Sequence, residues 1–475
     1  MTLPVHRSLA DAADPRGPTS LPRIVSGTAA WLFDRCGKGS IATYFRAVEI
    51  AYRFMDSYSW YGDEHDVFIV ALVIASKIEN EMELPYRDVH RMWRVRDAIY
   101  FHRLEVKMLD TLGFHVAFPT AYQFLLLVLE ESNLDAEMRA EATGVLTRAS
   151  FVPGVYMSVD PSPLACAAVA IAAPMRRMAF PNSAASVRRA VAMCACSCSS
   201  RSAAAAEAAK RPPRDDVWSV YDRHVRIGRG SYGAVFTATE RSSGKLFAVK
   251  RASIPDADFV SHGVEESVLR ELSITRMLPQ HDNINEFVTF FMSLNHETLR
   301  VHSVMALAEC DLYALLKKKG PLPEREVRSI TAQIANGLHF VHSHGIAHGD
   351  VKTHNILVFG DCVKISDFGT ASFYGHGLDL SGECTVHTRS PESLLGLSVR
   401  SWPVDMWALG CVTAEIAVGG ILMWMNGEAE LDVWRNIVAV LGTPSEQEWP
   451  DITKTKRWRV VREESQVGCE KCVLT

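Results

Sequence analysis

The chain has 475 residues, a formal net charge of −5 and 48% hydrophobic residues. This length predicts two or more domains, each large enough to bury its own core. The nearly balanced charge excludes a general electrostatic attraction to nucleic acid or to an anionic membrane surface, so neither is expected as a partner.

The amino-terminal tail, residues 1–21, contains charges and prolines but no apolar core of the kind found in secretory signals. The apolar runs 67–76 and 164–173 are too short to span a bilayer. The eleven cysteines are unevenly placed, which is typical of reduced thiols rather than of a disulfide framework. We therefore expect a soluble intracellular protein of the nucleus or cytoplasm.

Residues 22–180 are expected to form a helical domain. The run 67–76 is apolar all round, with Ser76 as its one polar residue, which fits either a buried strand or a helix enclosed by other helices. Amphipathic patterns on both sides favour the helix. A second, amphipathic helix covers 104–112 and ends at Gly113, and a third begins at Pro119.

These segments resemble a cyclin box. The matching residues are Phe54-Met55-Asp56, Ile74 to Asn80, Glu105 to Phe114 and Pro119 to Leu125. In cyclins a Lys and a Glu at the positions of Lys77 and Glu105 contact the kinase, so the resemblance implies interdomain docking through these two residues. Taken without the surrounding box, they fit two ordinary surface charges. Residues 134–180 resemble the beginning of a second, incomplete cyclin box.

Residues 181–217 are rich in Ala, Ser, Cys and Arg and are expected to form a linker. A flexible coil of its length has a root-mean-square span of roughly 33 Å. The first half of the chain could therefore dock on the second half of the same molecule.

A phosphate-binding pattern opens the second half. Ile227 to Val235 fits G-x-G-x-x-G-x-V, in which glycines let a hairpin close over phosphates. Lys250 follows at the end of an alternating strand, and Glu271 lies in a helical pattern. An ion pair between Lys250 and Glu271 would aim the lysine at the α- and β-phosphates.

The run from His348 to Asn355, followed by Asp367-Phe368-Gly369, predicts phosphoryl transfer. Asp350 would receive a hydroxyl proton, and Lys352 would neutralise the moving phosphate. Asn355 and Asp367 would hold Mg²⁺. Such chemistry depends on position and positive charge, so a few residues at fixed separations define the site.

In this order, the motifs resemble those of eukaryotic protein kinases, and most closely cyclin-dependent kinases. Further matching segments are Gly263 to Glu271, Ser390-Pro391-Glu392, Val404 to Cys411, Leu441 to Pro444 and Trp449-Pro450. The resemblance implies a kinase domain over 218–460, followed by a divergent tail over 461–475. It also implies ATP as a cofactor, bound by Ile227, Gly228, Gly230, Gly233, Val235, Ala248, Lys250, Met305, Ala306 and Ala308, with Met305 at the back of the adenine slot.

Several positions depart from the family pattern. Gly349 replaces an Arg that helps bind a phosphothreonine of the activation loop, and that threonine is also missing from 370–389. The two losses agree, because a kinase without a loop phosphate needs no Arg to bind it. Thr385 still matches the threonine that links the loop to the catalytic residues. Residues 383, 387 and 388 differ from the family's proline-selecting pocket, so a preference for Ser/Thr-Pro is not implied.

We therefore predict a multi-domain chain: an all-α cyclin-like domain and an α+β bilobal kinase fold whose C-lobe ends about two helices early. The predicted function is that of a Ser/Thr protein kinase with a fused cyclin-like activating domain as intramolecular partner and proteins as substrates. A second hypothesis is an inactive cell-cycle binding protein that sequesters or scaffolds an external cyclin or cyclin-dependent kinase. Intact Lys250, Asp350, Asn355 and Asp367 argue against the second hypothesis, and the early end argues for it.

Overall fold

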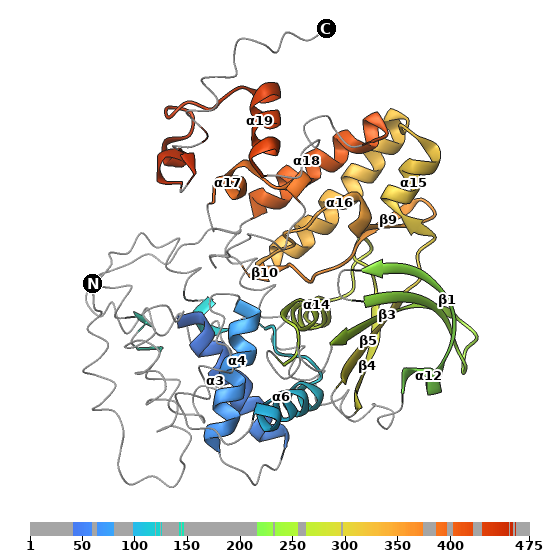
Figure 1. Cartoon of the computed structure of the whole chain (residues 1–475), viewed down its shortest axis with the longest axis vertical. Coiled ribbons are helices and arrows are strands. Elements are labelled where there is room, and N and C mark those ends of the chain that lie inside the picture. The colour runs from blue at the N-terminus through green and yellow to red at the C-terminus, as the bar shows by residue number, and fades with distance from the viewer. Residues whose placement is uncertain are drawn as a thin grey trace, which may run out of the picture. The chain divides into compact units, whose positions relative to one another are not determined.

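A computed structural model (Figure 1) describes residues 41–58, 64–79, 98–118, 120–123, 125, 142–143, 145–146, 216–230, 233–254, 263–295, 298–373, 386–396, 402–420, 430–455, 457–458 and 461. The chain divides into two compact units. The amino-terminal unit comprises Met1–Pro279 and Phe287–Met305, and the carboxy-terminal unit comprises Gln280–Glu286 and Ala306–Thr475.

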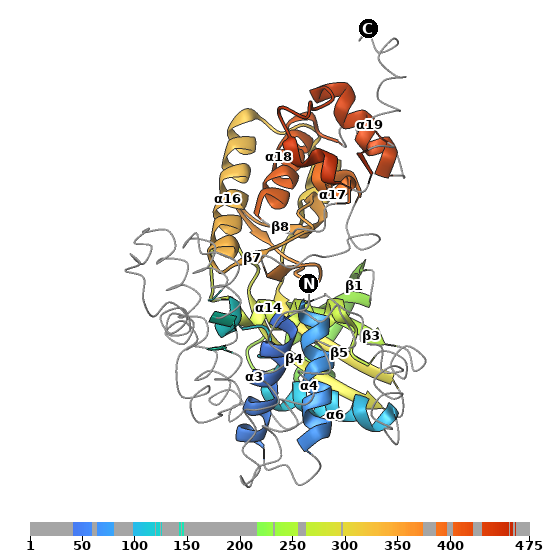
Figure 2. The ribbon, with the colours of Figure 1, turned by 90° about the vertical axis from the view of Figure 1, so that its left-hand side faces the viewer.

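Among the described residues, the first part of the amino-terminal unit contains the long helices α3 (Ile41–Ser57), α4 (Glu64–Glu79) and α6 (Ala98–Leu112). Figure 2 shows α3 and α4 running side by side. Every residue of α4 from Val67 to Glu79 is buried, which confirms the helix and excludes the strand for the run 67–76. The stop at Gly113 is also confirmed, because α6 ends at Leu112.

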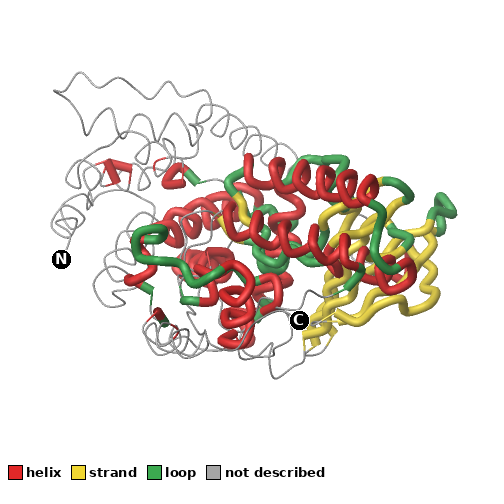
Figure 3. Tube along the Cα trace, turned by 90° about the horizontal axis from the view of Figure 1, so that it is seen from above, coloured by secondary structure: helices red, strands yellow, loops and turns green. Residues whose placement is uncertain are grey.

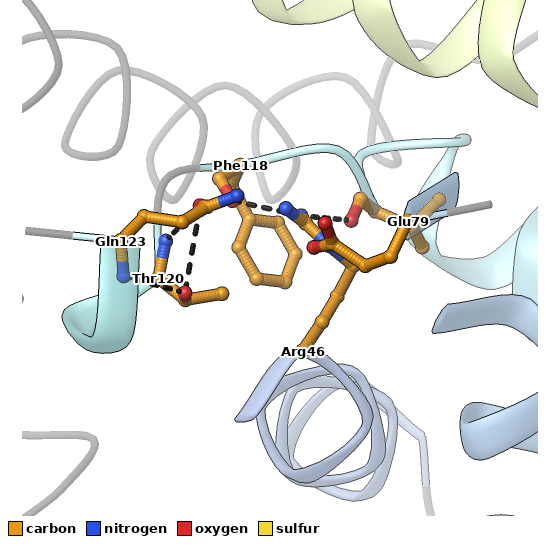
Figure 4. Close-up of polar contacts among 6 residues, drawn as sticks. Arg46, Glu79, Phe118, Thr120 and Gln123 are labelled. Atoms are coloured by element: carbon orange, nitrogen blue, oxygen red, sulfur yellow. Dashed lines mark hydrogen bonds and ion pairs between the residues drawn. The ribbon is translucent and has the colours of Figure 1, made fainter. Parts of the chain in front are cut away.

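A fully buried arginine joins these helices to the segment that follows α6. Arg46 of α3 forms an ion pair with Glu79 at the end of α4. Its Nη1 also donates hydrogen bonds to the main-chain oxygens of Val116, at 3.1 Å, and Phe118, at 2.8 Å. Figure 4 shows the guanidinium between Glu79 and Phe118. A buried charge requires such partners, since leaving it unpaired is costly.

The helix expected from Pro119 begins with reciprocal capping at Thr120 and Gln123 (Figure 4). The amide of Gln123 donates to the hydroxyl of Thr120 at 3.3 Å, and the amide of Thr120 donates to Oε1 of Gln123 at 2.9 Å. This arrangement is a capping box, which satisfies two amides that the first turn leaves unbonded. Residues 121–123 and 125 are helical, whereas 119 and 124 lie outside the described residues.

The amino-terminal unit continues into a five-stranded sheet in the order β1-β2-β3-β5-β4, visible as the yellow layer in Figure 3. Its strands are β1 (Tyr221–Gly230), β2 (Gly233–Glu240), β3 (Leu246–Ile254), β4 (Phe287–Asn295) and β5 (Thr298–Ala306). Helix α12 (Val217–Val220) precedes β1, and α14 (Glu266–Met277) follows β3. Val217, at the end of the expected linker, is buried in a core with Tyr221 and Val249.

Helices dominate the carboxy-terminal unit: α15 (Leu312–Lys319), α16 (Glu324–Ser343), α17 (Pro391–Leu394), α18 (Trp402–Val418) and α19 (Glu430–Leu441). Its described segments also contain the 3₁₀ helices η2 (Thr353–Asn355), η3 (Val386–Thr388) and η5 (Pro450–Lys454). Its short strands are β6 (Cys310–Asp311), β7 (Ile346–Ala347), β8 (Ile356–Phe359), β9 (Cys362–Ile365) and β10 (Ser372–Phe373), paired as β6-β8-β9 and β7-β10.

In this unit α16 packs on α18, where the hydroxyls of Thr331 and Thr413 lie 3.1 Å apart. Strand β7 packs against both helices, β9 packs against α16, and β8 packs against α15. None of the helices in the described part of the chain is long and apolar enough to cross a membrane. The expected linker up to residue 215, most of the expected second cyclin box over 134–180 and the tail from 462 lie outside the described residues.

Replacing Arg46 by Met should remove one partner of the buried pair and leave the Glu79 carboxylate uncompensated. We expect the free energy of unfolding of the amino-terminal unit to fall by about 3–5 kcal/mol. The matched control is Arg241→Met, which breaks an ion pair between half-exposed Arg241 and Asp222 and should cost at most about 1 kcal/mol. Urea unfolding followed by circular dichroism measures both, and equal losses would contradict the prediction.

Candidate active site

Lys250 and Glu271 meet inside the amino-terminal unit. Lys250 lies on β3 opposite Val235 of β2, and Glu271 lies near the middle of α14. The Nζ of Lys250 is 2.8 Å from both carboxylate oxygens of Glu271. Both side chains are largely shielded, with 21% and 16% exposure. The position of α14 therefore decides where the lysine points.

The residues expected around a nucleotide lie on neighbouring strands of the same unit. Gly228 and Gly230 of β1 pair with Val235 and Gly233 of β2. The tip of this hairpin, residues 231–232, is outside the described residues. The remaining predicted positions are half-exposed Ile227 on β1, buried Ala248 on β3, and Met305, Ala306 and Ala308 at and after the end of β5.

The predicted catalytic residues gather within the carboxy-terminal unit. The Nζ of Lys352 is 2.7 Å from Oδ2 of Asp350. The side-chain nitrogen of Asn355, in η2, donates to the main-chain oxygen of Asp350 at 2.8 Å and to its Oδ2 at 3.1 Å. Asp350 is 9% exposed. One carboxylate is thus fixed by an ammonium group and an amide, with little freedom to turn.

A buried aspartate on α18 holds the main chain just before Asp350. Asp405 accepts hydrogen bonds from the amides of His348 and Gly349, each at 2.8 Å. The Nε2 of His342 lies 2.8 Å from Oδ2 of Asp405. Burial would raise the pKa of Asp405, but the hydrogen bond and charge of His342 and the amide of Gly349 hold this pKa below its usual value. Asp405 is therefore an ionised anchor for the loop.

Asp367 has an unusual backbone, with φ of 66°. The segment before it is tied to the loop, because the amide of Ser366 donates to the main-chain oxygen of Asn355 at 2.9 Å. The Nε2 of His348 lies 3.1 Å from the main-chain oxygen of Ser366, and its ring contacts that of Phe368. Positive φ at a residue other than glycine is uncommon and is often found where a side chain must be aimed.

The side chains of Asn355 and Asp367 offer oxygen atoms that would fit a magnesium ion. The nitrogen of Asn355 donates to Asp350, so its amide oxygen could serve as a ligand. Asp367 adds a carboxylate. Magnesium prefers oxygen ligands and is usually held by one or two carboxylates together with substrate phosphates. No group of three or more His, Cys, Asp or Glu in the described segments is placed to hold a metal alone.

The activation segment is described only at its ends, so Thr385 lies outside the described residues. Gly349, which stands where an Arg was expected, has φ of 78°. Arg270 lies on α14 with its Nη1 3.5 Å from Glu266. At the far end of the segment, Arg389 forms an ion pair with Glu430, which also pairs with Arg457 near the carboxy terminus of the described chain.

Asp405, His342 and Glu415 have roles that the sequence reasoning missed. The hydroxyl of Thr353 donates to Glu415 at 3.2 Å, and burial raises the pKa of that carboxyl. A charged residue in the otherwise apolar helix 402–418 was the signal that could have marked Asp405 and Glu415 as buried anchors.

Lys77 and Glu105 lie together in the amino-terminal unit, 2.7 Å apart. Lys77 donates to the main-chain oxygen of Val264 at 2.8 Å, and the amide of Val264 donates to Glu105 at 3.3 Å. We call these bonds the Val264 contact. Burial would raise the pKa of Glu105, but Lys77 and His102 lower it below its usual value. The two side chains thus bind one peptide position just before α14.

The family model of the protein kinase domain matches residues 221–468, slightly more than half of the chain. The chain belongs to the protein kinase family. Cyclin-dependent kinase B2-1 of Oryza sativa subsp. japonica is 32% identical over 255 residues, which cover 50% of this chain and 74% of the relative. The cell division control protein 2 homolog C of Antirrhinum majus is 31% identical over 261 residues, covering 50% and 81%.

Cyclin-dependent kinase 10 of Homo sapiens is 34% identical over 238 residues, which cover 49% of this chain and 64% of the relative. The kinase is therefore a serine/threonine protein kinase similar to cyclin-dependent kinases. Its sheet-rich part and its helices agree with the expected kinase fold. The resemblance of the amino-terminal helices to a cyclin box stays a prediction.

Asp405 accepts hydrogen bonds from two main-chain amides, one at each carboxylate oxygen. Replacing it by Asn in this kinase should put a side-chain NH₂ donor against one of these N–H donors and break that bond. We expect kcat to fall by up to about 10²-fold, since a small displacement of catalytic groups has effects of that size. Because the pKa of Asp405 is lowered in the folded state, its stabilising contribution is present above the ordinary pKa of 3.8 and is lost as pH falls below it.

The stability difference between the wild type and Asp405→Asn should shrink accordingly in acid. The control is Asp432→Asn on the exposed face of α19, where the ion pair with Arg435 is solvated. Phosphotransfer assays and urea unfolding at several pH values measure these effects. An unchanged kcat in Asp405→Asn would show that this carboxylate does not position the loop.

Proposed function

We propose that this kinase is activated in cis by its own amino-terminal helices, which act as a fused cyclin-like domain. The observation that carries the proposal is the Val264 contact. Val264 lies just before α14, the helix whose Glu271 holds Lys250. A partner that fixes the start of α14 also fixes Glu271, and with it the direction of the lysine.

Gly263 supports this proposal, because its position accommodates Glu105. A Cβ at residue 263 would lie 2.1 Å from Oε2 of Glu105, and the backbone there has φ of +72°. Only glycine adopts this conformation without strain and leaves that space open. The sequence before α14 is thus matched to a carboxylate arriving from the helices of the first half.

For the chemistry, we propose that Asp350 orients the substrate hydroxyl and accepts its proton. Lys352 lies beside Asp350 and stabilises negative charge on the transferred phosphoryl group. Lys250 binds the α- and β-phosphates of ATP while Glu271 holds it in place. Asn355 and Asp367 would hold magnesium, which supplies positive charge to the phosphates.

The residues Ile227, Gly228, Gly230, Gly233, Val235, Ala248, Met305 and Ala306 on the strands, together with Ala308 just after β5, would surround the nucleotide. The acceptor is a Ser or Thr of a protein, consistent with Lys352. The hydroxyl of Ser or Thr is neutral and must lose its proton during the transfer, so a base has to lie close to it. The fixed carboxylate of Asp350 would be that base. We further propose that Thr385 links the activation segment to these residues.

Replacing Lys250 by Met, or Asp350 by Asn, should each abolish phosphate transfer to a generic Ser/Thr substrate. The first change removes a charge at the phosphates, and the second removes the proton acceptor. We expect losses of at least about 10²-fold in kcat/KM, with unfolding midpoints close to wild type for Asp350→Asn. Transfer of labelled phosphate from ATP measures the effect. If both variants keep activity within a few-fold of wild type, the measured transfer does not come from this site. That outcome would favour the inactive binding protein instead.

The cis-activation proposal can be tested by exchanging two charges. In the double variant Lys77→Glu with Glu105→Lys, the two side chains keep opposite charges and can still pair. The carboxylate would then face the main-chain oxygen of Val264, and the ammonium would face its amide, so the Val264 contact is lost. Removing buried charged contacts at an interface costs about 2–5 kcal/mol. We expect kcat/KM to fall by at least about ten-fold at every protein concentration.

The same contact can be broken from the kinase side by Gly263→Ala, which places a Cβ against Glu105. The matched control is Gly244→Ala: its φ is +70°, so the backbone strain is comparable, but nothing lies within 4 Å of the added Cβ. Activity should fall in Gly263→Ala and stay near wild type in Gly244→Ala. If the charge exchange and Gly263→Ala both leave activity intact, the amino-terminal helices are not the activator.

A further inference from the structure

Two arginines from distant parts of the chain meet one carboxylate in the carboxy-terminal unit. Glu430, the first residue of α19, accepts from Arg389 at Oε1 and from Arg457 at Oε2. Arg389 directly follows η3 and is 5% exposed, whereas Arg457 follows η5 and its side chain is 45% exposed. Because each carboxylate oxygen is bound to its own guanidinium, the orientation of the Glu430 side chain is fixed.

Arg457 also binds the end of a second helix. Its Nη1 donates to the main-chain oxygen of Leu394, the last residue of α17, at 3.1 Å. The last carbonyls of a helix have no partner within the helix, so a side-chain donor there is favourable. Helices α17 and α19 lie side by side (Figure 1). We call the bonds of Arg389 and Arg457 to Glu430, with the bond to Leu394, the Glu430 bridge.

The segment that carries Arg457 is held in place by packing. Trp458 is buried in one apolar core with Ile452, Leu395 and Trp434 of α19. The hydroxyl of Thr455 donates to the main-chain oxygen of Ile452 at 2.8 Å, which closes the turn between them. The guanidinium therefore projects from an ordered backbone. An ion pair held in this way is worth more than one between two freely moving surface side chains.

The Glu430 bridge lies next to the structure that supports the catalytic loop. Val386 of η3 and Trp407 of α18 both pack against an apolar cluster that contains Leu394. Trp407 is two residues after Asp405, whose carboxylate holds the main chain just before Asp350. The same end of α18 thus supports both η3 and the loop that carries the proposed proton acceptor.

We propose that Arg457 is a positioning residue for the surface that receives the protein substrate. It holds Glu430 against Arg389, and so keeps η3 in place near the loop of Asp350. A polypeptide that presents a Ser or Thr hydroxyl to Asp350 has to lie on the surface around that loop. None of the residues expected around ATP belongs to the Glu430 bridge. This inference rests on the proposed role of Asp350 and adds the neighbouring surface that binds the acceptor.

The test uses the full-length kinase with casein as the protein acceptor, and compares Arg457→Met with Arg435→Met. Methionine keeps most of the apolar stem of arginine and removes every donor. In Arg457→Met we expect the KM for casein to rise about ten-fold, an effect typical of a lost hydrogen bond to a charged group. The kcat and the KM for ATP should stay within about two-fold of wild type, because only ground-state binding of the acceptor is weakened.

Arg435→Met is the matched control, since it removes a solvated ion pair with Asp432 on the same helix. All three kinetic constants should then stay within about two-fold of wild type. An unchanged KM for casein in Arg457→Met would overturn the proposal. Equal increases of the KM for casein and the KM for ATP would also overturn it, because they would indicate a general loosening of the fold.

A double-mutant cycle tests whether Arg457 acts through Glu430. In a Glu430→Gln background, Arg457→Met should raise the KM for casein by less than about two-fold further. The same increase in both backgrounds would reject the action through Glu430. If Glu430→Gln does not fold, Arg457→Lys serves instead: it keeps the charge, so its KM for casein should lie within about three-fold of wild type. A KM as high as that of Arg457→Met would then count against the ion pair.

Hydrogen exchange separates this inference from the proposed catalytic role. The amides of residues 386–396 should exchange about ten-fold faster in Arg457→Met than in wild type or Arg435→Met. Unchanged exchange would show that Arg457 does not hold η3 and α17. Failure of the catalytic assignment has a different signature, because Asp350→Asn would then still transfer phosphate.

Discussion

The structure of the amino-terminal unit depends on how one buried ion pair uses its remaining hydrogen-bonding capacity. Lys77 and Glu105 neutralise each other, but each still has donors or acceptors to satisfy. They are satisfied by the two polar groups of a single residue, Val264. Neither the helices nor the loop before α14 could shift without breaking buried hydrogen bonds between these charged groups and Val264. The contact is therefore specific although its target is only main chain.

The same principle organises the carboxy-terminal unit. Asp405 is buried and ionised, and its main partners are the amides of His348 and Gly349 together with His342. Asp350 is in turn fixed by Lys352 and Asn355. In both units, a buried carboxylate pairs with a basic side chain and also accepts hydrogen bonds from main-chain amides, so it depends on the position of the backbone. Such an arrangement tolerates sequence change in the loop while it preserves geometry, which is consistent with glycine at position 349.

The features that could be predicted from the sequence are those that depend on residue type and on the spacing of apolar residues along the chain. The run 67–76, apolar except for Ser76, indicated an enclosed helix, and Gly113 indicated a helix end. Both signals lie in the local sequence itself and do not depend on a distant partner. The partner of Lys77 could not be predicted in atomic detail, since a main-chain group carries no sequence signal. Phe114 was equally hidden, because a positive φ at phenylalanine arises from contacts with β4 rather than from local preference. Asp405 was noted as part of a motif, yet its role depends on amides distant in the sequence.

Covalent linkage explains why modest contacts suffice in the proposed arrangement. For a separate activator, the Val264 contact would have to offset the loss of translational and rotational freedom. On one chain the linker would set an effective concentration on the order of millimolar. The same contact then only needs to stabilise the docked arrangement against the undocked arrangement of the same molecule. Selection would then act less on interface area than on pre-organisation of the contacting segments. Arg46 meets that requirement, because it rigidly relates the end of α4 to the turn after α6 before either meets the kinase domain.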